Sequence, residues 1–214
     1  MNDEVIVLGD SVTQGVGFSG VTVSTRFVSL LQNEIREAGL SATLTSSALD
    51  GADTGYALKR FDRMVARLQP EFLVVALGLN DARPPGNRMA CDPDAYAGNL
   101  SELTERAMEI DARPILATPS PRIDVMNGRL SFATMKPYAE SARRVARNYQ
   151  LPIIDVFDSL TAQDNLDSLI PDRLHPGPAA HKLIAEQFAQ TLLPLLGAQQ
   201  KKKLTPSREN ATAW

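Results

Sequence analysis

Two distant segments of the sequence carry the residue types that nucleophilic catalysis requires. Ser11 follows the apolar run at residues 5–8, and His175 lies near the other end of the chain with Asp172 three residues before it. A hydroxyl nucleophile, an imidazole base and a carboxylate that orients the base are the groups that acyl transfer needs. The short spacing lets Asp172 and His175 converge from one turn, so that Asp172 fixes the tautomer of His175. This chemistry requires that the fold bring Ser11 and His175 together.

Acyl transfer also requires hydrogen-bond donors for the oxyanion of its tetrahedral intermediate. Asn80 offers a neutral side-chain amide, and Gly51 lets the backbone approach closely and present its N–H. We expect Ser11 at or just before the N-terminus of a helix, where backbone N–H groups point outward and favour negative charge. The N–H of Ser11 is therefore a third expected donor.

A regular alternation of strand-like and helix-like segments must position these residues. Apolar runs that predict strands occur at residues 4–8, 42–48, 72–77, 114–119 and 151–157. Segments with apolar residues three and four apart predict helices at 27–39, 56–68, 96–110, 135–149 and 179–196. The alternation predicts a three-layer α/β/α fold with a five-stranded parallel sheet in the flavodoxin-like order 2-1-3-4-5.

The loops that follow the strands contain every residue named above. In open α/β sheets the chemistry takes place at the carboxyl ends of the strands. Ser11, Gly51 and Asn80 follow the first, second and third predicted strands. Asp172 and His175 end the long loop after the fifth. These five residues are therefore expected at one edge of the sheet.

These blocks together resemble the SGNH or GDSL-type serine hydrolases. GDS at 9–11, a glycine after the second strand, GLND at 78–81 and DRLH at 172–175 occur in the order typical of that family. The resemblance extends over residues 5–195. GDS alone is a weak signal, whereas four blocks in this order are specific.

The resemblance implies an esterase or lipase-like acylhydrolase that cleaves carboxylic esters or thioesters through an acyl-enzyme intermediate. It implies Ser11 as the nucleophile and Asp172 with His175 as the other members of the triad. It also implies an oxyanion hole formed by Ser11, Gly51 and Asn80. No metal or organic cofactor is implied, and the expected partner is a small-molecule ester.

The sequence also contains partial motifs of two other kinds of site, a dinucleotide-binding site and a dinuclear metal site. Residues 15–20 spell GxGxxG, but residues 9–14 separate them from the first strand, whereas a dinucleotide-binding glycine ends its strand directly. A dinuclear metal phosphoesterase usually draws on more nitrogen ligands than the two histidines of this chain supply. One of these, His181, is expected in the final helix as a surface or half-buried residue. We therefore predict neither site.

Charged residues close to the blocks have simpler expected roles. Asp10 and Asp81 are expected to hold their loops by binding backbone amides. Arg83, Arg88 and Arg122 lie on loops near the predicted mouth of the site, where they could receive an anionic group of the substrate. A solvated surface role is the preferred interpretation for each of the three.

Composition limits the remaining classes of function. The formal net charge of −3, with no basic stripe, argues against a nucleic-acid partner. The single cysteine, Cys91, excludes an internal disulfide and a cysteine metal cluster. No segment has the length and apolar character of a membrane span, so the cytoplasm is the expected location. We expect one domain over residues 1–196 and a mobile tail over 197–214, and the sequence specifies no oligomeric state.

Two loops are expected to shape the substrate pockets, at residues 82–92 and 120–132. Neither carries a long apolar stretch. This favours short acyl chains, such as acetyl on a sugar or a small alcohol, over long lipids. The alternatives are a lysophospholipase or thioesterase that acts on longer chains, and a noncatalytic carbohydrate- or partner-binding protein on the same fold.

Overall fold

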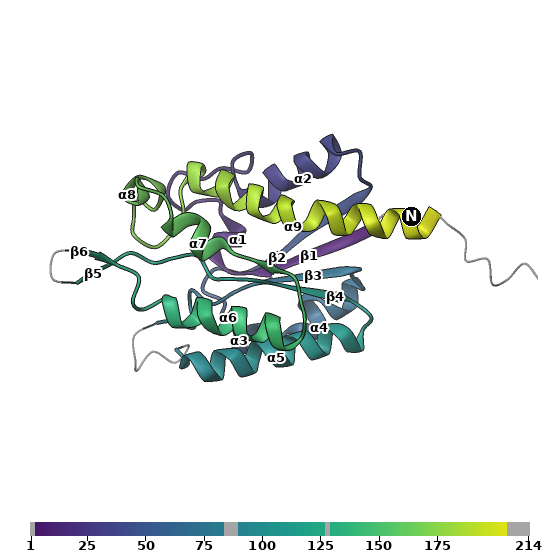
Figure 1. The fold of residues 1–214 in the computed structure, drawn as a ribbon, viewed down its shortest axis with the longest axis horizontal. Coiled ribbons are helices and arrows are strands. Elements are labelled where there is room, and N and C mark those ends of the chain that lie inside the picture. Colours follow the sequence, from purple (N-terminus) through teal and green to yellow (C-terminus); the bar gives the residue numbers. More distant parts are fainter. Residues whose placement is uncertain (1–2, 84–89, 127–128, 205–214) are drawn as a thin grey trace, which may run out of the picture.

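Helices cover both faces of one parallel sheet in the computed structural model of the chain (Figure 1). The structure describes residues 3–83, 90–126 and 129–204. The sheet has five strands in the order β2-β1-β3-β4-β7, and all neighbouring strands are parallel. In chain order this is 2-1-3-4-5, so the predicted three-layer α/β/α fold and its strand order are confirmed.

The first strand lies inside the sheet, between β2 and β3, and helices cover both of its faces. The strands are β1 (Asp3–Gly9), β2 (Ala42–Ala48), β3 (Phe72–Ala76), β4 (Arg113–Ala117) and β7 (Ile153–Ile154). From Val5 to Leu8 every side chain of β1 is fully buried. A strand covered on both faces needs a continuous apolar run, which explains this segment of the sequence.

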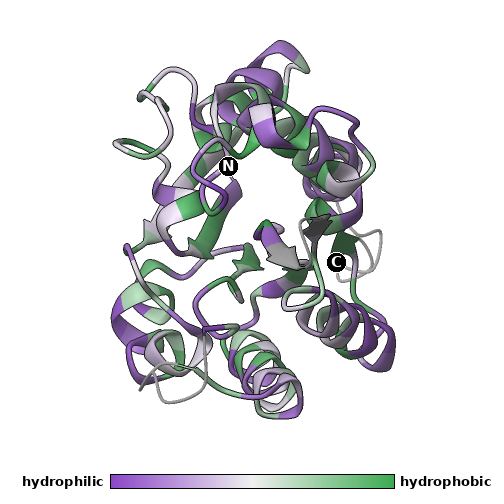
Figure 2. Cartoon of the chain, turned by 90° about the vertical axis from the view of Figure 1, so that its left-hand side faces the viewer, coloured by the Kyte–Doolittle hydropathy of each residue, from purple (hydrophilic) through white to green (hydrophobic). Residues whose placement is uncertain are grey.

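Two helical layers enclose the sheet (Figure 1). One contains α1 (Ser11–Gln14), α2 (Phe27–Glu37), α7 (Val156–Thr161) and α9 (Pro178–Leu204); the other contains α3 (Thr54–Lys59), α4 (Phe61–Met64), α5 (Pro93–Glu109) and α6 (Lys136–Asn148). Figure 2, which looks onto the carboxyl ends of the strands, shows largely green strands among helices that carry both green and purple sides. Within the described residues, none of these helices combines the length and the apolar character needed to traverse a bilayer.

Several predicted elements differ from the observed ones. The helix expected at 56–68 is divided into α3, α4 and a short 3₁₀ helix (Ala66–Leu68). The loop after β4 contains an unpredicted antiparallel hairpin of β5 (Asp124–Met126) and β6 (Arg129–Ser131). A short helix, α8 (Leu166–Leu169), lies in the loop before His175.

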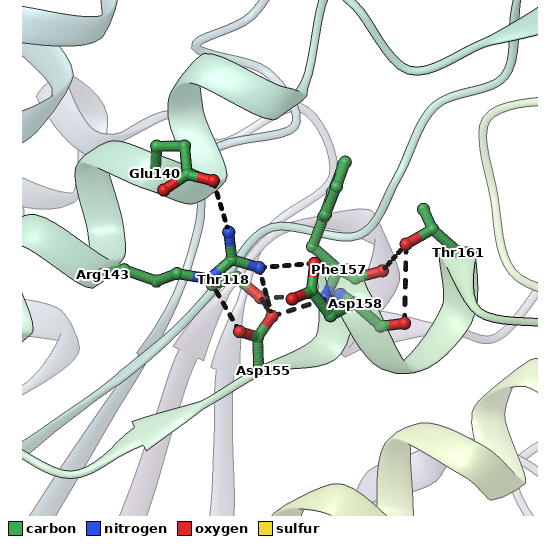
Figure 3. A network of polar contacts seen from close by, with 7 residues as sticks. All are labelled: Thr118, Glu140, Arg143, Asp155, Phe157, Asp158 and Thr161. Atoms are coloured by element: carbon green, nitrogen blue, oxygen red, sulfur yellow. Dashed lines mark hydrogen bonds and ion pairs between the residues drawn. The ribbon is translucent and has the colours of Figure 1, made fainter.

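The strand expected at 151–157 ends after Ile154, because Asp155 begins a helix instead. Its side chain accepts a hydrogen bond from the N–H of Asp158 and caps α7. Arg143 of α6 pairs with Asp155 at 2.7 Å and with Asp158 at 2.7 Å (Figure 3). Burial raises the pKa of Asp155, but its hydrogen bonds with Arg143, Asp158 and Thr118 and the charge of Arg143 together hold the pKa below its ordinary value. The apolar run therefore continues as a capped helix.

The mobile tail expected from residue 197 is wrong for residues 197–204, which form the last turns of α9. The Lys203 ammonium lies 2.5 Å from an Asp3 carboxylate oxygen and 3.3 Å from one of Glu71. Lysine is a good helix former, and these acidic partners at the amino ends of β1 and β3 tie the helix to the sheet. The rest of the expected tail, residues 205–214, lies outside the described residues.

His181 is fully buried, which corrects the expectation of a surface or half-buried residue. It lies in α9, as predicted, and its Nδ1 accepts a hydrogen bond from the backbone N–H of Phe27 at 3.0 Å. That N–H opens α2, whose cap residue, Arg26, makes no side-chain cap hydrogen bond. His181 therefore caps α2 from another helix. Burial lowers the pKa of His181 to about 4.

This buried imidazole makes the stability of the fold dependent on pH. Because the pKa of His181 is lower in the folded state than the ordinary 6.5, its contribution is complete above about pH 6.5 and is lost as the pH falls through about 4. Between pH 7 and pH 5 the free energy of unfolding should fall by about 2 kcal/mol more in the wild type than in His181→Asn, which keeps an acceptor for the N–H. Urea unfolding at both pH values measures the difference. Parallel losses in the two proteins would contradict this assignment.

Candidate active site

Ser11 opens α1 directly after the central strand β1. The turn is tight, because a Cβ on Gly9 would collide with the Thr13 side chain. Asp10 caps the helix, with its Oδ1 accepting a hydrogen bond from the N–H of Val12 at 2.9 Å. Ser11 is 3% exposed. The predicted location of Ser11 at a helix N-terminus and the predicted bracing role of Asp10 are both observed.

Asp172 and His175 form a hydrogen-bonded pair in the turn before α9. The distance from Asp172 Oδ2 to His175 Nδ1 is 2.8 Å, and the other carboxylate oxygen accepts the backbone N–H groups of Leu174 and His175. Burial raises the pKa of Asp172, but the hydrogen bonds from His175 and Leu174 and the charge of His175 together hold the pKa below its ordinary value. An ionised carboxylate only accepts hydrogen bonds, so Nδ1 carries the proton and Nε2 is left as the basic nitrogen.

Asn80 has a side-chain amide whose orientation is set by its neighbours. Its Nδ2 donates to the carbonyl oxygen of Ala52 at 2.9 Å, and its Oδ1 accepts from Arg83 Nη2 at 2.6 Å. A carbonyl oxygen cannot donate and a guanidinium cannot accept, so the amide cannot be reversed. Nδ2 also lies 3.5 Å from Asp10 Oδ2. Asn80 therefore lies between the residue before Ser11 and the residue after Gly51.

The loop that contains Gly51 is joined to α1. Gly51 has a φ of +75°, a conformation that suits glycine. The neighbouring N–H of Asp50 donates to the side chain of Gln14, the last residue of α1, at 3.1 Å. The structure thus brings the segments of Ser11, Gly51 and Asn80 together at the carboxyl ends of β1, β2 and β3.

The loop after α1 connects this group to His175. The ring of Phe18 stacks on the His175 imidazole, with 4.3 Å between centroids and 27° between planes. Ser19 Oγ donates to the carbonyl oxygen of His175 at 2.8 Å. Within the described residues no hydrogen bond joins Ser11 itself to His175; such bonds often tighten only when substrate binds. The glycines at 15–20 belong to this loop and open no helix, unlike those of a dinucleotide site.

Two flanking arginines are placed differently from the sequence-based expectation. Arg83 is half-buried against Asn80, and Arg122 donates to the carbonyl oxygen of Ala82 at 3.2 Å and pairs with Asp124. Neither is a freely solvated surface residue. The contact of Arg122 with Ala82 joins the loops after β3 and β4. Arg88 lies outside the described residues.

Asp81 has the bracing role expected from the sequence. It accepts hydrogen bonds from the N–H and the hydroxyl of Thr54, the first residue of α3, and from the Cys91 thiol. It thereby joins the loops after β2 and β3. Across the described residues, no three His, Cys, Asp or Glu side chains gather in an arrangement suited to a metal ion.

Comparison with known proteins shows the family and the fold to which the chain is similar. The profile of the GDSL-like lipase/acylhydrolase family matches residues 7–183. The chain is 24% identical over 192 residues to an arylesterase of Vibrio mimicus, a match that covers 90% of this chain and 89% of that protein. It is also 24% identical over 200 residues to thioesterase 1/protease 1/lysophospholipase L1 of Escherichia coli, covering 91% and 85%. The crystal structure of a lipase/acylhydrolase from Enterococcus faecalis superposes with a TM-score of 0.76 at 24% identity and covers 92% of this chain and 96% of that one.

Asp10 is the buried carboxyl group closest to Ser11 in the sequence, and its environment disfavours charge. Burial is the main reason that its pKa is raised to about 7. The hydrogen bond from the N–H of Val12 lowers the pKa, and the nearby carboxylate of Asp81 raises it further. The group that caps α1 is therefore partly protonated near neutral pH.

The stability of the fold should consequently fall as Asp10 ionises. Since its pKa is about 7 in the folded state and ordinarily 3.8, the folded form holds the proton more tightly, and stability is lost as the pH rises through about 7. Between pH 5 and pH 8 the wild type should lose about 2–3 kcal/mol of unfolding free energy relative to Asp10→Asn, which keeps the capping oxygen. Denaturant unfolding of both proteins at the two pH values gives the comparison. A constant difference between them would show that Asp10 does not titrate in this range.

Proposed function

Because the chain belongs to the GDSL-like lipase/acylhydrolase family, we propose that this esterase hydrolyses carboxylic esters or thioesters through an acyl-enzyme formed on Ser11. The single observation that carries the proposal is the hydrogen-bonded pair of Asp172 and His175, whose turn adjoins the loop that follows Ser11. Such a pair supplies an oriented base, and Ser11, at the start of the helix that precedes this loop, supplies the hydroxyl.

Each group has a defined role in the proposed mechanism. Ser11 Oγ attacks the acyl carbonyl while Nε2 of His175 takes its proton, and Asp172 holds the Nδ1–H and stabilises the imidazolium. The oxyanion receives hydrogen bonds from the backbone N–H groups of Ser11 and Gly51 and from Asn80 Nδ2. His175 then protonates the leaving alcohol. In the second half of the reaction it activates a water molecule, which releases the acid and restores Ser11.

The orientation of Asn80 supports its proposed role. Nδ2 carries two hydrogens, and the short hydrogen bond to the Ala52 carbonyl oxygen uses one of them. The contact of the other with Asp10 is long, at 3.5 Å. An oxyanion is a better acceptor than a partly protonated carboxyl group, so the second hydrogen can be donated to it.

We propose a small-molecule ester with a short acyl chain, such as acetyl, as the substrate. Neither loop expected to shape the pockets, at 82–92 and 120–132, carries a long apolar stretch. The Vibrio relative is named an arylesterase, which is consistent with a small aryl ester as a substrate. The name of the Escherichia coli relative favours the second candidate, a thioesterase or lysophospholipase that takes longer chains. The third alternative, a noncatalytic binding protein, would not require the oriented base. The cytoplasmic location stays a prediction.

Replacing the proposed nucleophile gives the direct test of the mechanism. Ser11→Ala should lower kcat for p-nitrophenyl acetate by about 10⁴-fold or more, because the attacking oxygen is removed, while the fold remains intact. The same change should abolish covalent labelling by a fluorophosphonate. Ser24→Ala, at an exposed serine outside the site, is the matched control and should react like the wild type. Near wild-type turnover or labelling of Ser11→Ala would refute the mechanism.

A series of p-nitrophenyl esters from acetate to palmitate distinguishes the two substrate classes. We expect kcat/KM to be highest for acetate or butyrate and to fall by at least 10-fold by octanoate, because a pocket without a long apolar wall gains little from added methylenes. Steady-state kinetics of the purified protein measure this trend. A maximum at ten or more carbons would instead support the lysophospholipase or thioesterase alternative.

A further inference from the structure

The loop between α1 and α2 is built to hold one aromatic ring in place. Gly15, Gly17 and Gly20 have φ values of +71°, +94° and +77°, and Ser19 has a φ of +45°. The N–H of Val21 donates to the carbonyl oxygen of Phe18 at 2.8 Å, which closes the loop on itself. A non-glycine residue persists at positive φ only when its surroundings fix it. The Ser19 hydroxyl supplies that fixation through the carbonyl oxygen of His175.

The base of this loop rests on the protein core. A Cβ on Gly15 would lie 2.9 Å from the Arg26 Cβ and 3.2 Å from Cε1 of the buried His181. Glycine at this position therefore lets the chain leave α1 directly over α9. The ring of Phe18, half-buried, consequently approaches His175 from a backbone that is anchored at both ends.

The imidazole of His175 needs such a contact. Its hydrogen bond to Asp172 fixes Nδ1, but a single hydrogen bond leaves the ring free to tilt about the line that joins the two partners. A proton transfer to Nε2 requires one particular orientation of the ring plane, in which this nitrogen is within hydrogen-bond reach of the reacting oxygen. An aromatic ring at 4.3 Å from the imidazole centroid and nearly parallel to it blocks rotation toward that face.

We propose that Phe18 and Ser19 are positioning residues for the reaction, which act by fixing the ring plane and the backbone of His175. This inference rests on the proposed function of His175 as general base. Phe18 provides the face against which the imidazole stacks, and Ser19 holds the backbone from which it extends. Phe18 and Ser19 are thus the two residues of the loop after α1 that support the reaction, beyond the connection that the loop makes to α2.

The main test is the replacement of the ring by an aliphatic side chain of similar size. Phe18→Leu should lower kcat for p-nitrophenyl acetate about 10-fold with KM unchanged within about twofold, since a lost aromatic contact of about 1.5 kcal/mol corresponds to that factor. Phe18→Tyr, which keeps the ring, should recover most of the loss. Val16→Ala, at an exposed residue of the same loop, is the control and should have wild-type kinetics. If Phe18→Tyr is as slow as Phe18→Leu, or Phe18→Leu as fast as the wild type, the inference is wrong.

A double-mutant cycle separates positioning of His175 from a general effect on the fold or on substrate binding. In a His175→Ala background no imidazole remains to be positioned, so Phe18→Leu should cause no further loss of the residual turnover. An equal loss in both backgrounds would overturn the inference. If thermal unfolding shows that Phe18→Leu is not folded, Ser19→Ala takes its place in the cycle. We expect Ser19→Ala to lower turnover several-fold, and only when His175 is present.

The two levels of the hypothesis can fail separately. Undiminished activity in Ser11→Ala and His175→Ala would refute the proposed function whatever Phe18 does. Inactive Ser11→Ala and His175→Ala proteins together with wild-type turnover in Phe18→Leu would leave the proposed function standing and overturn only the role of the loop.

Discussion

The turn from β1 into α1 is the constraint on which the rest of the site depends. Asp10 caps α1 through Val12 and also lies next to the amide of Asn80, while Gln14 at the other end of α1 binds the loop of Gly51. One four-residue helix therefore fixes the relative positions of three strand ends. The interior location of β1 supports this arrangement, because its neighbours on both sides are parallel strands with a continuous register.

Asp10 and His181, two buried residues near this turn, have pKa values that are shifted in opposite directions, and each shift disfavours the charged form. Burial raises the pKa of the Asp10 carboxyl at the start of α1 and lowers the pKa of His181 beneath its end. Each makes a hydrogen bond that an apolar residue could not make, to the first turn of α1 and of α2 respectively. Between about pH 4 and pH 7 both groups are neutral in the folded protein, and the stability gained through His181 as the pH rises offsets the stability lost through Asp10.

The sequence predicted those features that depend on local pattern. The run from Val5 to Leu8 could only be a strand buried on both faces, and the spacing of Asp172 and His175 anticipated a local pair that the structure contains. Contacts between distant segments were not predictable in this way. Periodicity located His181 on a helix, but its burial depends on the approach of α2, and the role of Phe18 depends on a turn more than 150 residues away. The early end of β7 was not predicted, because Asp155, which caps α7, forms an ion pair with Arg143 of another helix, α6.

Two loops hold the segment of His175 from different sides, and this couples the proposed chemistry to substrate choice. Ser19 binds the carbonyl oxygen of His175, and the N–H of Ile123, at the root of the β5–β6 hairpin, donates to the carbonyl oxygen of Arg173 at 2.9 Å. The second contact joins the turn to the loop that we expect to shape a substrate pocket. A change of sequence in that loop alters the support of the imidazole as well as the pocket wall. In the proposed mechanism, substrate range and turnover are therefore coupled, because the proposed general base is supported by the same loop that we expect to shape a substrate pocket.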